Sequence, residues 1–372
     1  MQCKHFGVCG GCTLPGVPYA EQLAKKQQLL SRLLGMDVPP LIPSPAESGF
    51  RNKVSFVFAN GVMGHYALKS QRVIPIDECP VHHERGNRIA FALASAFARV
   101  TSFGATGSFK SVLRHIIVRT TQDGREASAM LVVRSNEKAL RTPVKKFLAS
   151  AERPDGFFVN IHPKPGPYMV GDETIKIEGR SHVKEVVAGV SYLVSPTAFF
   201  QTNVGAAEQL VKIVLEEVDE LKGSSLRVLD LYCGSGLFSL QLAKAGARVT
   251  AVEENRQAIA DAEANVRLNR IPPGQVRFMA VRVEDALARV AKDSWDVVVL
   301  DPPRQGCPPA VLSAVFEDIR PVKVVYVCCN PDALATELPG ILKTGYRVTR
   351  VQPVDMFPHT DHIETVMAFS RG

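Results

Sequence analysis

Short apolar runs alternate with helical segments through the second half of the chain, and this alternation restricts the fold more than any other feature. The apolar runs predict strands at residues 226–231, 248–253, 276–281, 295–301 and 322–328. The spacing between and after them predicts helices at 237–245, 255–269, 284–291, 308–319 and 331–342. Strands that alternate with helices form an open, mostly parallel sheet, so we predict an α/β, Rossmann-like domain. Two last strands, 346–354 and 363–370, have no clear helix between them and predict an antiparallel edge pair.

The first half of the chain has a different pattern. Alternating apolar and polar residues predict strands at 53–58, 113–121, 129–134, 157–162 and 174–178. Helices are predicted at 21–34, 87–100 and 137–151, with a proline-rich linker at 39–45. This mixture predicts an α+β domain. Because 372 residues correspond to about two domains of ~100–200 residues, we place the domains at 1–190 and 191–372.

Basic residues are concentrated in the first of these domains. Residues 1–190 contain 25 Lys and Arg against 15 Asp and Glu, whereas residues 191–372 contain 19 against 22. A basic domain beside a slightly acidic one indicates a polyanion-binding module joined to a different chemical activity. A solvated basic surface is the alternative interpretation.

Hydropathy and cysteine use indicate the compartment. No stretch reaches the ~18 uncharged apolar residues of a membrane span, and the first residues, Met1–Phe6, lack the apolar stretch of a signal peptide. Eight cysteines without an export signal indicate reduced thiols used for metal binding or catalysis. We expect a cytoplasmic monomer with no membrane partner.

A glycine loop at Asp230–Gly236 ends the first strand of the second domain and begins a helix. Gly234 and Gly236 allow a ligand to approach the backbone closely. Glu253 ends the next strand, about 20 residues later, where a carboxylate can bind both ribose hydroxyls. The third glycine of a dinucleotide fingerprint is missing, and Asp230 suits a cationic sulfonium ligand, so S-adenosylmethionine is favoured over NAD. A glycine turn that only packs strand against helix would not need Glu253.

Asp301-Pro-Pro-Arg304 follows the fourth strand of this sheet. Ligands of open α/β sheets lie at the carboxyl ends of the strands, so Asp301 is placed to contact the cofactor. Amino-group methyltransferases have a similar Asp/Asn-Pro-Pro followed by an aromatic ring that stacks on the base. Arg304 stands in that place here, which argues against methylation of an amino group.

Cys329 is the candidate nucleophile, because it lies where the fifth strand ends and a helix begins. Asn330 is predicted as the N-cap and Pro331 as the first helical residue. The positive end of the helix dipole should then lower the pKa of the thiol from ~8.5. Cys328 and Cys329 could instead both pack as small apolar residues, as we expect for Cys233 and Cys307.

Glu364 is the candidate general base. The segment 355–364 is rich in acid–base groups, and Glu364 directly precedes the last apolar strand. A carboxylate there can face the same edge of the sheet as Cys329 and accept a proton. A capping carboxylate in a polar loop is the alternative.

Together these motifs resemble the RNA (uracil-C5)-methyltransferase family. The resemblance rests on five segments and spans almost the whole chain: Phe199–Asn203, Asp230–Gly236, Asp301–Gly306, Cys329–Asn330 and Phe357–Glu364. It implies that Gln201, Tyr232, Glu253 and Asp301 contact S-adenosylmethionine. It also implies that Cys329 is the nucleophile that attacks C6 of uracil, that Glu364 is the base, and that the target uridine is flipped out of its stack.

Four further cysteines indicate a metal site. Cys3, Cys9 and Cys12 have a C-x5-C-x2-C spacing, and Cys79 precedes a proline far downstream. Structural zinc sites usually show two short ligand pairs, whereas a set of three plus one with a final Cys-Pro is closer to an iron–sulfur arrangement, so a [4Fe–4S] cluster is favoured and zinc stays open. In the family, the ribosomal RNA branch has four such cysteines and the transfer RNA branch lacks them. The resemblance thus implies a cluster-bearing α+β domain and a 23S ribosomal RNA substrate, with no TRAM barrel.

The RNA and adenine contacts are less specific. Phe50–Lys53 occurs in the family, and further candidates for RNA contact are Arg114, His115, Arg119 and Arg134. Relatives often have an acidic residue after the third strand for the adenine side; here Arg282 occupies that position, and Glu284 or Asp285 could replace it. Three other functions stay open: an amino-group RNA methyltransferase, a non-catalytic RNA-binding module and, more distantly, an iron–sulfur redox enzyme.

Overall fold

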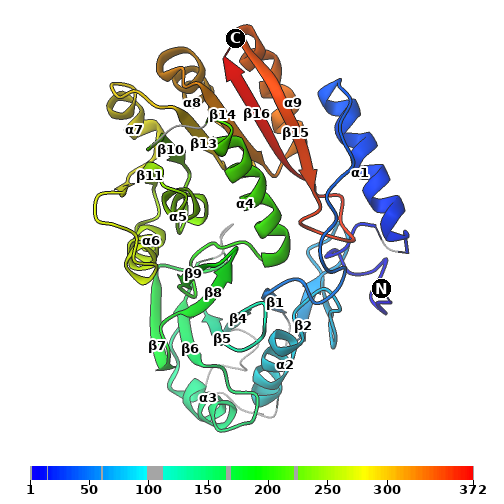
Figure 1. Cartoon of the computed structure of the whole chain (residues 1–372). Helices are drawn as coiled ribbons and strands as arrows, with labels where there is room; N and C mark the ends of the chain where they lie inside the picture. The colour runs from blue at the N-terminus through cyan, green and yellow to red at the C-terminus, as the bar shows by residue number, and fades with distance from the viewer. Residues whose placement is uncertain are drawn as a thin grey trace.

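The computed structural model describes residues 2–14, 16–59, 62–98, 112–164, 169–221 and 225–371. Two seven-stranded sheets form its two halves, and a short hairpin lies between them (Figure 1). No helix of these residues is both long and apolar enough to cross a membrane.

The first sheet has the strand order β3-β2-β1-β4-β5-β6-β7. Its strands are β1 (Lys53–Ala59), β2 (Val62–Tyr66), β3 (Val73–Pro75), β4 (Leu113–Thr120), β5 (Ala127–Val133), β6 (Gly156–Ile161) and β7 (Glu173–Gly179). Helices α2 (Glu84–Ala98) and α3 (Arg141–Leu148) cover one face, and a 3-10 turn, Lys138–Leu140, precedes α3. Apolar residues of alternating strand positions, such as Val54 and Phe56, pack beneath these helices. The predicted α+β organisation of this half is confirmed.

The second sheet has the strand order β12-β11-β10-β13-β14-β16-β15. Its strands are β10 (Arg227–Leu231), β11 (Arg248–Glu253), β12 (Val276–Ala280), β13 (Val297–Leu300), β14 (Lys323–Cys328), β15 (Tyr346–Val354) and β16 (Glu364–Arg371). All pairs among β10–β14 are parallel, while β16 runs antiparallel between β14 and β15. The predicted Rossmann-like sheet and its antiparallel end are therefore confirmed, and the edge strand is β15.

Helices cover both faces of this second sheet. They are α4 (Val204–Asp219), α5 (Leu237–Lys244), α6 (Arg256–Leu268), α7 (Val283–Val290), α8 (Pro309–Ser313), continued by a π-helical turn at Ala314–Ile319, and α9 (Pro331–Lys343). Helix α1 (Tyr19–Leu34), although it begins the chain, lies beside α9. Leu30 and Leu34 of α1 are buried in the same apolar cluster as the second sheet. Residues from the beginning of the chain therefore pack on the Rossmann-like half.

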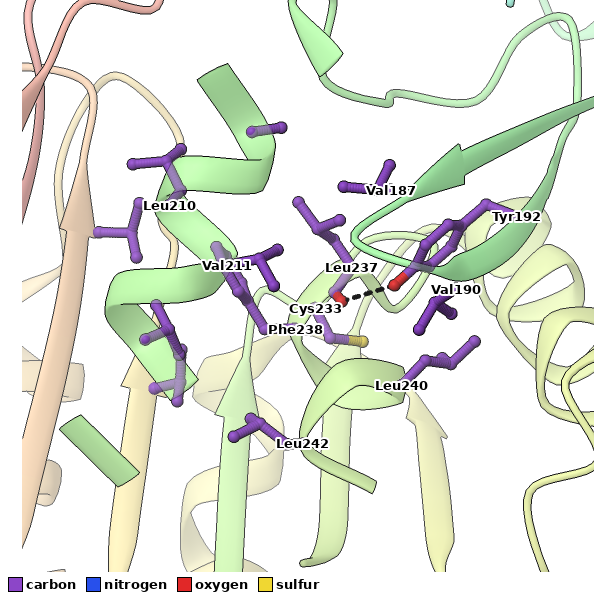
Figure 2. Close-up of a cluster of buried hydrophobic side chains, with 14 of the residues drawn as sticks. Val187, Val190, Tyr192, Leu210, Val211, Cys233, Leu237, Phe238, Leu240 and Leu242 are labelled. Atoms are coloured by element: carbon purple, nitrogen blue, oxygen red, sulfur yellow. Dashed lines mark hydrogen bonds between the residues drawn. The ribbon is translucent and has the colours of Figure 1, made fainter. Parts of the chain in front are cut away.

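The hairpin of β8 (Val183–Val187) and β9 (Val190–Val194) joins the two halves. The predicted domain boundary at residue 190 falls on the first residue of β9, and both strands pack into the core of the second sheet. Figure 2 shows Tyr192 of this hairpin donating a hydrogen bond of 2.9 Å to the carbonyl of Leu237, at the beginning of α5. This bond fixes the hairpin on the helix that follows the glycine loop. The division at residue 190 stays a prediction.

Candidate active site

The carboxyl ends of the parallel strands bring the predicted cofactor residues together. Asp230, in β10, is fully buried; its Oδ2 accepts a hydrogen bond from Ser239, and its Oδ1 has no partner among the described residues. Burial raises the pKa of this carboxyl to about 7. Tyr232 follows in the left-handed region, at φ 67°, and its buried hydroxyl also has no partner in the described part of the chain. Two orphaned polar atoms thus face the glycine loop, and buried polar groups normally have partners.

The glycine loop itself is open to a ligand. Gly234 has φ +54°, and a Cβ atom built on it would meet no described heavy atom within 4 Å. Its N–H donates to Glu253 Oε2 over 3.2 Å, while Glu253 Oε1 accepts from the Asn255 N–H over 2.8 Å. Glu253 therefore ends β11 beside the loop, as predicted, and helps to fix the loop conformation.

Asp301 ends β13, next to β10 in the sheet. Burial and the nearby charge of Asp230 raise the pKa of this carboxyl to about 7. Two carboxyl groups that disfavour each other's ionisation create a site that favours a cation. A sulfonium group has the charge that would relieve this repulsion.

Strand register brings the candidate nucleophile and base to one place. In the antiparallel pair of β14 and β16, Cys328 lies opposite Thr365. Cys329 follows Cys328 and Glu364 precedes Thr365, so both are at the same end of the pair. The negative charges at this edge disfavour one another. Glu364 and Asp301 both raise the pKa of Cys329, and Asp301 raises the pKa of Glu364.

The protonation states at this edge differ from the sequence-based expectation. Asn330 is the N-cap and accepts from the Asp332 N–H over 3.2 Å, and Pro331 begins α9, as predicted. The pKa of Cys329 is nevertheless raised to about 11, chiefly by burial. Burial likewise raises the pKa of Glu364, which is 3% exposed, to about 8. The predicted lowering of the thiol pKa is therefore wrong for the protein without ligands, because burial and two carboxylates outweigh the helix end.

Arg304 is a cation that acts on both of these groups. Its charge lowers the pKa of both Cys329 and Glu364, against the larger effect of burial. Its carbonyl accepts from Asn330 Nδ2 over 2.8 Å, and its guanidinium lies 3.4 Å from His362 Nε2. The residue that replaces the aromatic ring of amino-group methyltransferases thus lies at the nucleophile.

The loop that leads to Glu364 is tied to the beginning of the chain. Lys26, on α1, forms a buried ion pair of 2.6 Å with Asp355. The carbonyl of His359 accepts from the N–H groups of Thr13 and Leu14, both over 3.0 Å. The Thr13 hydroxyl also donates to Asp361 over 3.1 Å. Sequence reasoning missed this role of α1, because the contacts span more than 300 residues.

The segment Phe199–Asn203 connects the hairpin to α4. Gln201 is 8% exposed, and Asn203 caps α4 and donates to the Met356 carbonyl over 3.0 Å. The structure thus joins this motif to the loop that carries Glu364. Phe199, two residues before Gln201, is 67% exposed, which is unusual for a large aromatic ring. Phe199 begins this motif, but no role was predicted for it, because its exposure is visible only in the structure.

Similarity to known proteins extends along the chain. Residues 172–371 match the family described as tRNA (Uracil-5-)-methyltransferase. An uncharacterized RNA methyltransferase of Thermosynechococcus vestitus is 34% identical over 96% of this chain and 81% of its own length. Another, from Synechocystis sp., is 34% identical over 96% of this chain and 79% of its own length. This chain belongs to the tRNA (uracil-5-)-methyltransferase family.

A solved structure supports the assignment. The crystal structure of Pyrococcus abyssi tRNA (uracil-54, C5)-methyltransferase in complex with S-adenosyl-L-homocysteine has a TM-score of 0.80 and 29% identity to this chain. The similarity covers 97% of this chain and 84% of that one. The chain is therefore an S-adenosylmethionine-dependent RNA (uracil-5-)-methyltransferase with the α/β fold of that class. This membership argues against the binding-only and redox alternatives.

The four N-terminal candidate ligands of this family member line one cavity. Cys3, Cys9, Cys12 and Cys79 share a space of about 260 Å³, together with Arg51 and several histidines. Burial raises the pKa of Cys12 to about 11 and that of Cys79 to about 12. Among the described residues, no three of these sulfurs lie within 4.8 Å of one another. The four thiols thus line the cavity, but their sulfurs are too far apart to bind one ion together.

The predicted RNA contacts differ in their accessibility. Arg134 is exposed, and Arg114 donates to the carbonyls of His162 and Lys164, both over 2.7 Å. Arg119 is 3% exposed, and His115 is 9% exposed. The prediction that Arg119 and His115 contact RNA at the surface is therefore wrong, because the first sheet and the segment around Ala198 cover them. In Phe50–Lys53, the side chain of Arg51 faces the thiol cavity.

Proposed function

We propose that this enzyme methylates carbon 5 of a specific loop uridine in 23S ribosomal RNA, with Cys329 as nucleophile and Glu364 as general base. The observation that carries the proposal is the β14–β16 register, which brings these two side chains to the edge where Asp230, Glu253 and Asp301 also lie. A thiol and a carboxyl group at a cofactor edge are the two groups that substitution at uracil C5 requires.

The reaction follows from the weak nucleophilicity of uracil C5. Attack of the Cys329 sulfur on C6 forms an S–C6 bond and shifts the electron pair of the C5–C6 double bond onto C5 and the adjacent carbonyl oxygen. Once C5 carries the methyl group, Glu364 takes the C5 proton, the C5–C6 double bond re-forms and the S–C6 bond breaks. The uracil must leave its stack to reach the half-buried Cys329 thiol, so a flipped uridine is expected.

The residues of the glycine loop fit S-adenosylmethionine. The orphaned Asp230 and Tyr232 oxygens, the open space at Gly234 and the mutual repulsion of the two buried carboxyl groups suit a cationic nucleoside. When bound, this cofactor supplies an electrophilic methyl group. We assign its binding to Gln201, Tyr232, Gly234, Glu253 and Asp301.

Two charged residues near the glycine loop are candidates for the adenine side. The charge of Glu284 raises the pKa of Tyr232 and that of Arg282 lowers it, so both lie near the loop. Arg282 lies 3.5 Å from the Glu284 carboxylate. We therefore propose Glu284 for the contact that relatives make with an acidic residue after the third strand, oriented by Arg282.

A [4Fe–4S] cluster is our proposal for the four cysteines. Sulfurs spread around a cavity of about 260 Å³ suit a cluster better than one tetrahedral zinc, whose bonds of about 2.3 Å draw its ligands close together. Arg51 supports this, because its guanidinium balances the net negative charge of a cluster with four thiolate ligands. The uracil reaction needs no redox step, so the cluster would be structural or would face RNA.

The RNA substrate rests on the cysteines. Within the family, the four-cysteine pattern is typical of the ribosomal RNA branch, and this favours 23S ribosomal RNA. A transfer RNA uridine is the second candidate, because the Pyrococcus abyssi relative that matches 97% of this chain acts on tRNA uracil 54.

Release of tritium tests the reaction. The protein is incubated with S-adenosylmethionine and RNA that carries tritium at uridine C5, using fragments of 23S ribosomal RNA and, separately, transfer RNA. We expect tritium in water from the ribosomal RNA, none with Cys329→Ala, and near-normal release with the matched control Cys328→Ser. Release from transfer RNA alone would replace the proposed substrate. Methyl incorporation without release would contradict substitution at C5.

A further inference from the structure

Two histidines converge on one of the cavity cysteines. Of the residues that the structure describes, only His65, Cys79 and His82 bring three potential ligand atoms within 4.8 Å of one another. His65 lies on β2, while Cys79 and His82 lie in the loop between β3 and α2. Neither histidine belongs to the four-cysteine pattern. Cys79 thus belongs both to this group of three close ligands and to the four cysteines that line the cavity.

Hydrogen bonds fix the tautomer of His82. Asn87 Nδ2 donates to the Cys79 carbonyl over 2.9 Å, so the other amide atom of Asn87, Oδ1, must be an acceptor. This oxygen lies 3.2 Å from His82 Nδ1, which therefore carries the proton. The lone pair of His82 is then on Nε2. A metal-binding histidine typically has this arrangement, with its second ring nitrogen donating to a fixed acceptor.

Packing fixes the ring of His65. It stacks on Phe56, with ring centroids 4.8 Å apart and planes inclined by 19°. It meets His82 edge-on, with centroids 5.4 Å apart and planes inclined by 84°. Phe56 is fully buried, so neither ring can move without disturbing the core of the first sheet. The two imidazoles are thus held in place before any ion binds.

We propose that His65, Cys79 and His82 form a second metal site, which binds a single divalent ion of the zinc type when the cavity holds no iron–sulfur cluster. One thiolate and two imidazoles are zinc-type ligands, and a water or a further cavity thiol completes the tetrahedron. Binding converts the Cys79 thiol to a thiolate and releases its proton to solvent. Because Cys79 serves both sets, ion and cluster exclude each other. The proposal does not rest on the uridine reaction or on the RNA substrate.

Cobalt(II) is the probe, because its tetrahedral thiolate complexes absorb visible and near-ultraviolet light. The full-length Cys3→Ser/Cys9→Ser/Cys12→Ser variant, which cannot hold a four-cysteine cluster, is titrated with Co²⁺. We expect one ion per chain and the charge-transfer band of a single thiolate. His65→Gln and His82→Gln in this background should each weaken binding at least ~10-fold, and Asn87→Leu should weaken it about 10–100-fold. His83→Gln, beside His82 but outside the set, should not.

Unchanged Co²⁺ affinity in His65→Gln and His82→Gln would overturn the proposal, and so would a stable triple variant that binds no Co²⁺. If the triple variant does not fold, the wild-type chain stripped of iron by a chelator is titrated, and the same histidine substitutions are compared there. In that chain, a band that several thiolates produce, insensitive to both histidines, would assign the ion to the four cysteines instead. Methyl transfer is not a readout, so its failure leaves this test intact.

Discussion

Burial of two reactive groups is the main feature at the scale of single residues. In the proposed reaction, Glu364 must lose its proton to act as a base, and Cys329 must lose its proton to attack C6. Their pKa values, raised to about 8 and about 11, place both deprotonations above neutral pH. The rate should therefore rise with pH from about 6 to 9. Single-turnover tritium release at a series of pH values measures this, and a rate that falls over the range would contradict the assigned roles.

The same carboxyl group predicts a dependence of stability on pH. The pKa of Glu364 is raised from 4.5 to about 8, so its contribution to stability is fully present below about 4.5 and is lost as the pH rises through about 8. Glu364→Gln keeps the shape and removes the charge. We expect the variant to melt at a higher Tm than the wild type at pH 9 and at a similar Tm at pH 5. The gain in the free energy of unfolding at pH 9 should be on the order of a few kcal/mol or less. Thermal melts at both values decide this; equal Tm at pH 9 would count against it.

The positions of these residues could be predicted from the sequence, but their environments could not. Asp230, Glu253, Asp301 and Cys329 follow apolar runs, and the carboxyl ends of parallel strands meet at one edge. What surrounds each side chain depends on strands that are distant in sequence. The thiol pKa is the clearest example, because the opposing carboxylate comes from β16.

At the scale of elements, α1 holds the loop that leads to the proposed base, Glu364. Lys26 and Asp355 are 2% and 0% exposed, and Lys26 also donates to the Phe357 carbonyl over 3.1 Å. Lys26→Met would leave a buried carboxylate without its cation, so we expect a loss of about 3–5 kcal/mol in the free energy of unfolding. Urea unfolding measures it. The matched control is Lys25→Met, because Lys25 is exposed on the same helix, and an equal loss there would contradict the argument.

The glycine loop allows ligand binding and stability to be separated. Both Gly234 and Gly236 have positive φ, but a Cβ at Gly236 would lie 2.5 Å from the buried Leu240 side chain, whereas one at Gly234 would meet open space. Gly236→Ala should cost about 1–3 kcal/mol of stability. Gly234→Ala should cost less stability than Gly236→Ala. It should weaken the binding of S-adenosylmethionine more, by at least ~10-fold. Thermal melts and calorimetric titration compare them, and the reverse order would show that Gly234 does not face the ligand.

Strands with strong apolar runs were predicted well, whereas several short strands and one long helix were missed. Strands β11 and β15 have the predicted bounds, because strong apolar runs bounded by turns define them. The short strands β2 and β3 and the β8–β9 hairpin have too few residues to show a clear alternation. Helix α4 was not predicted, although its exposed Lys212 and Glu216 give it a polar side at i, i+4 spacing.

At the scale of the whole molecule, Arg51 links the electrostatics of the thiol cavity and of the catalytic edge. It lines the thiol cavity, and its pKa is raised by Cys12 and Cys79 and lowered by Arg304. This cation would stabilise the proposed anionic cluster, whereas it would repel a lone divalent ion. Arg51→Gln should therefore speed the loss of cluster absorbance to a chelator but tighten Co²⁺ binding at His65, Cys79 and His82. The exposed Arg72→Gln is the control, and a change of the same sign in both assays would contradict this electrostatic account.

The bonds between residues 13–45 and 353–361 have a consequence for the order in which the protein folds. The hydrogen bonds of Thr13 to Asp361 and of Lys26 to Asp355 close loops of 348 and 329 residues, while most strand pairs close far shorter ones. Contacts between such distant residues form late, because the entropy of loop closure is lost before the contact stabilises anything. Both sheets can therefore be complete while the loop before Glu364 is still loose. In refolding followed by pulsed hydrogen exchange, amide protection at 355–361 should appear last, together with methyl-transfer activity.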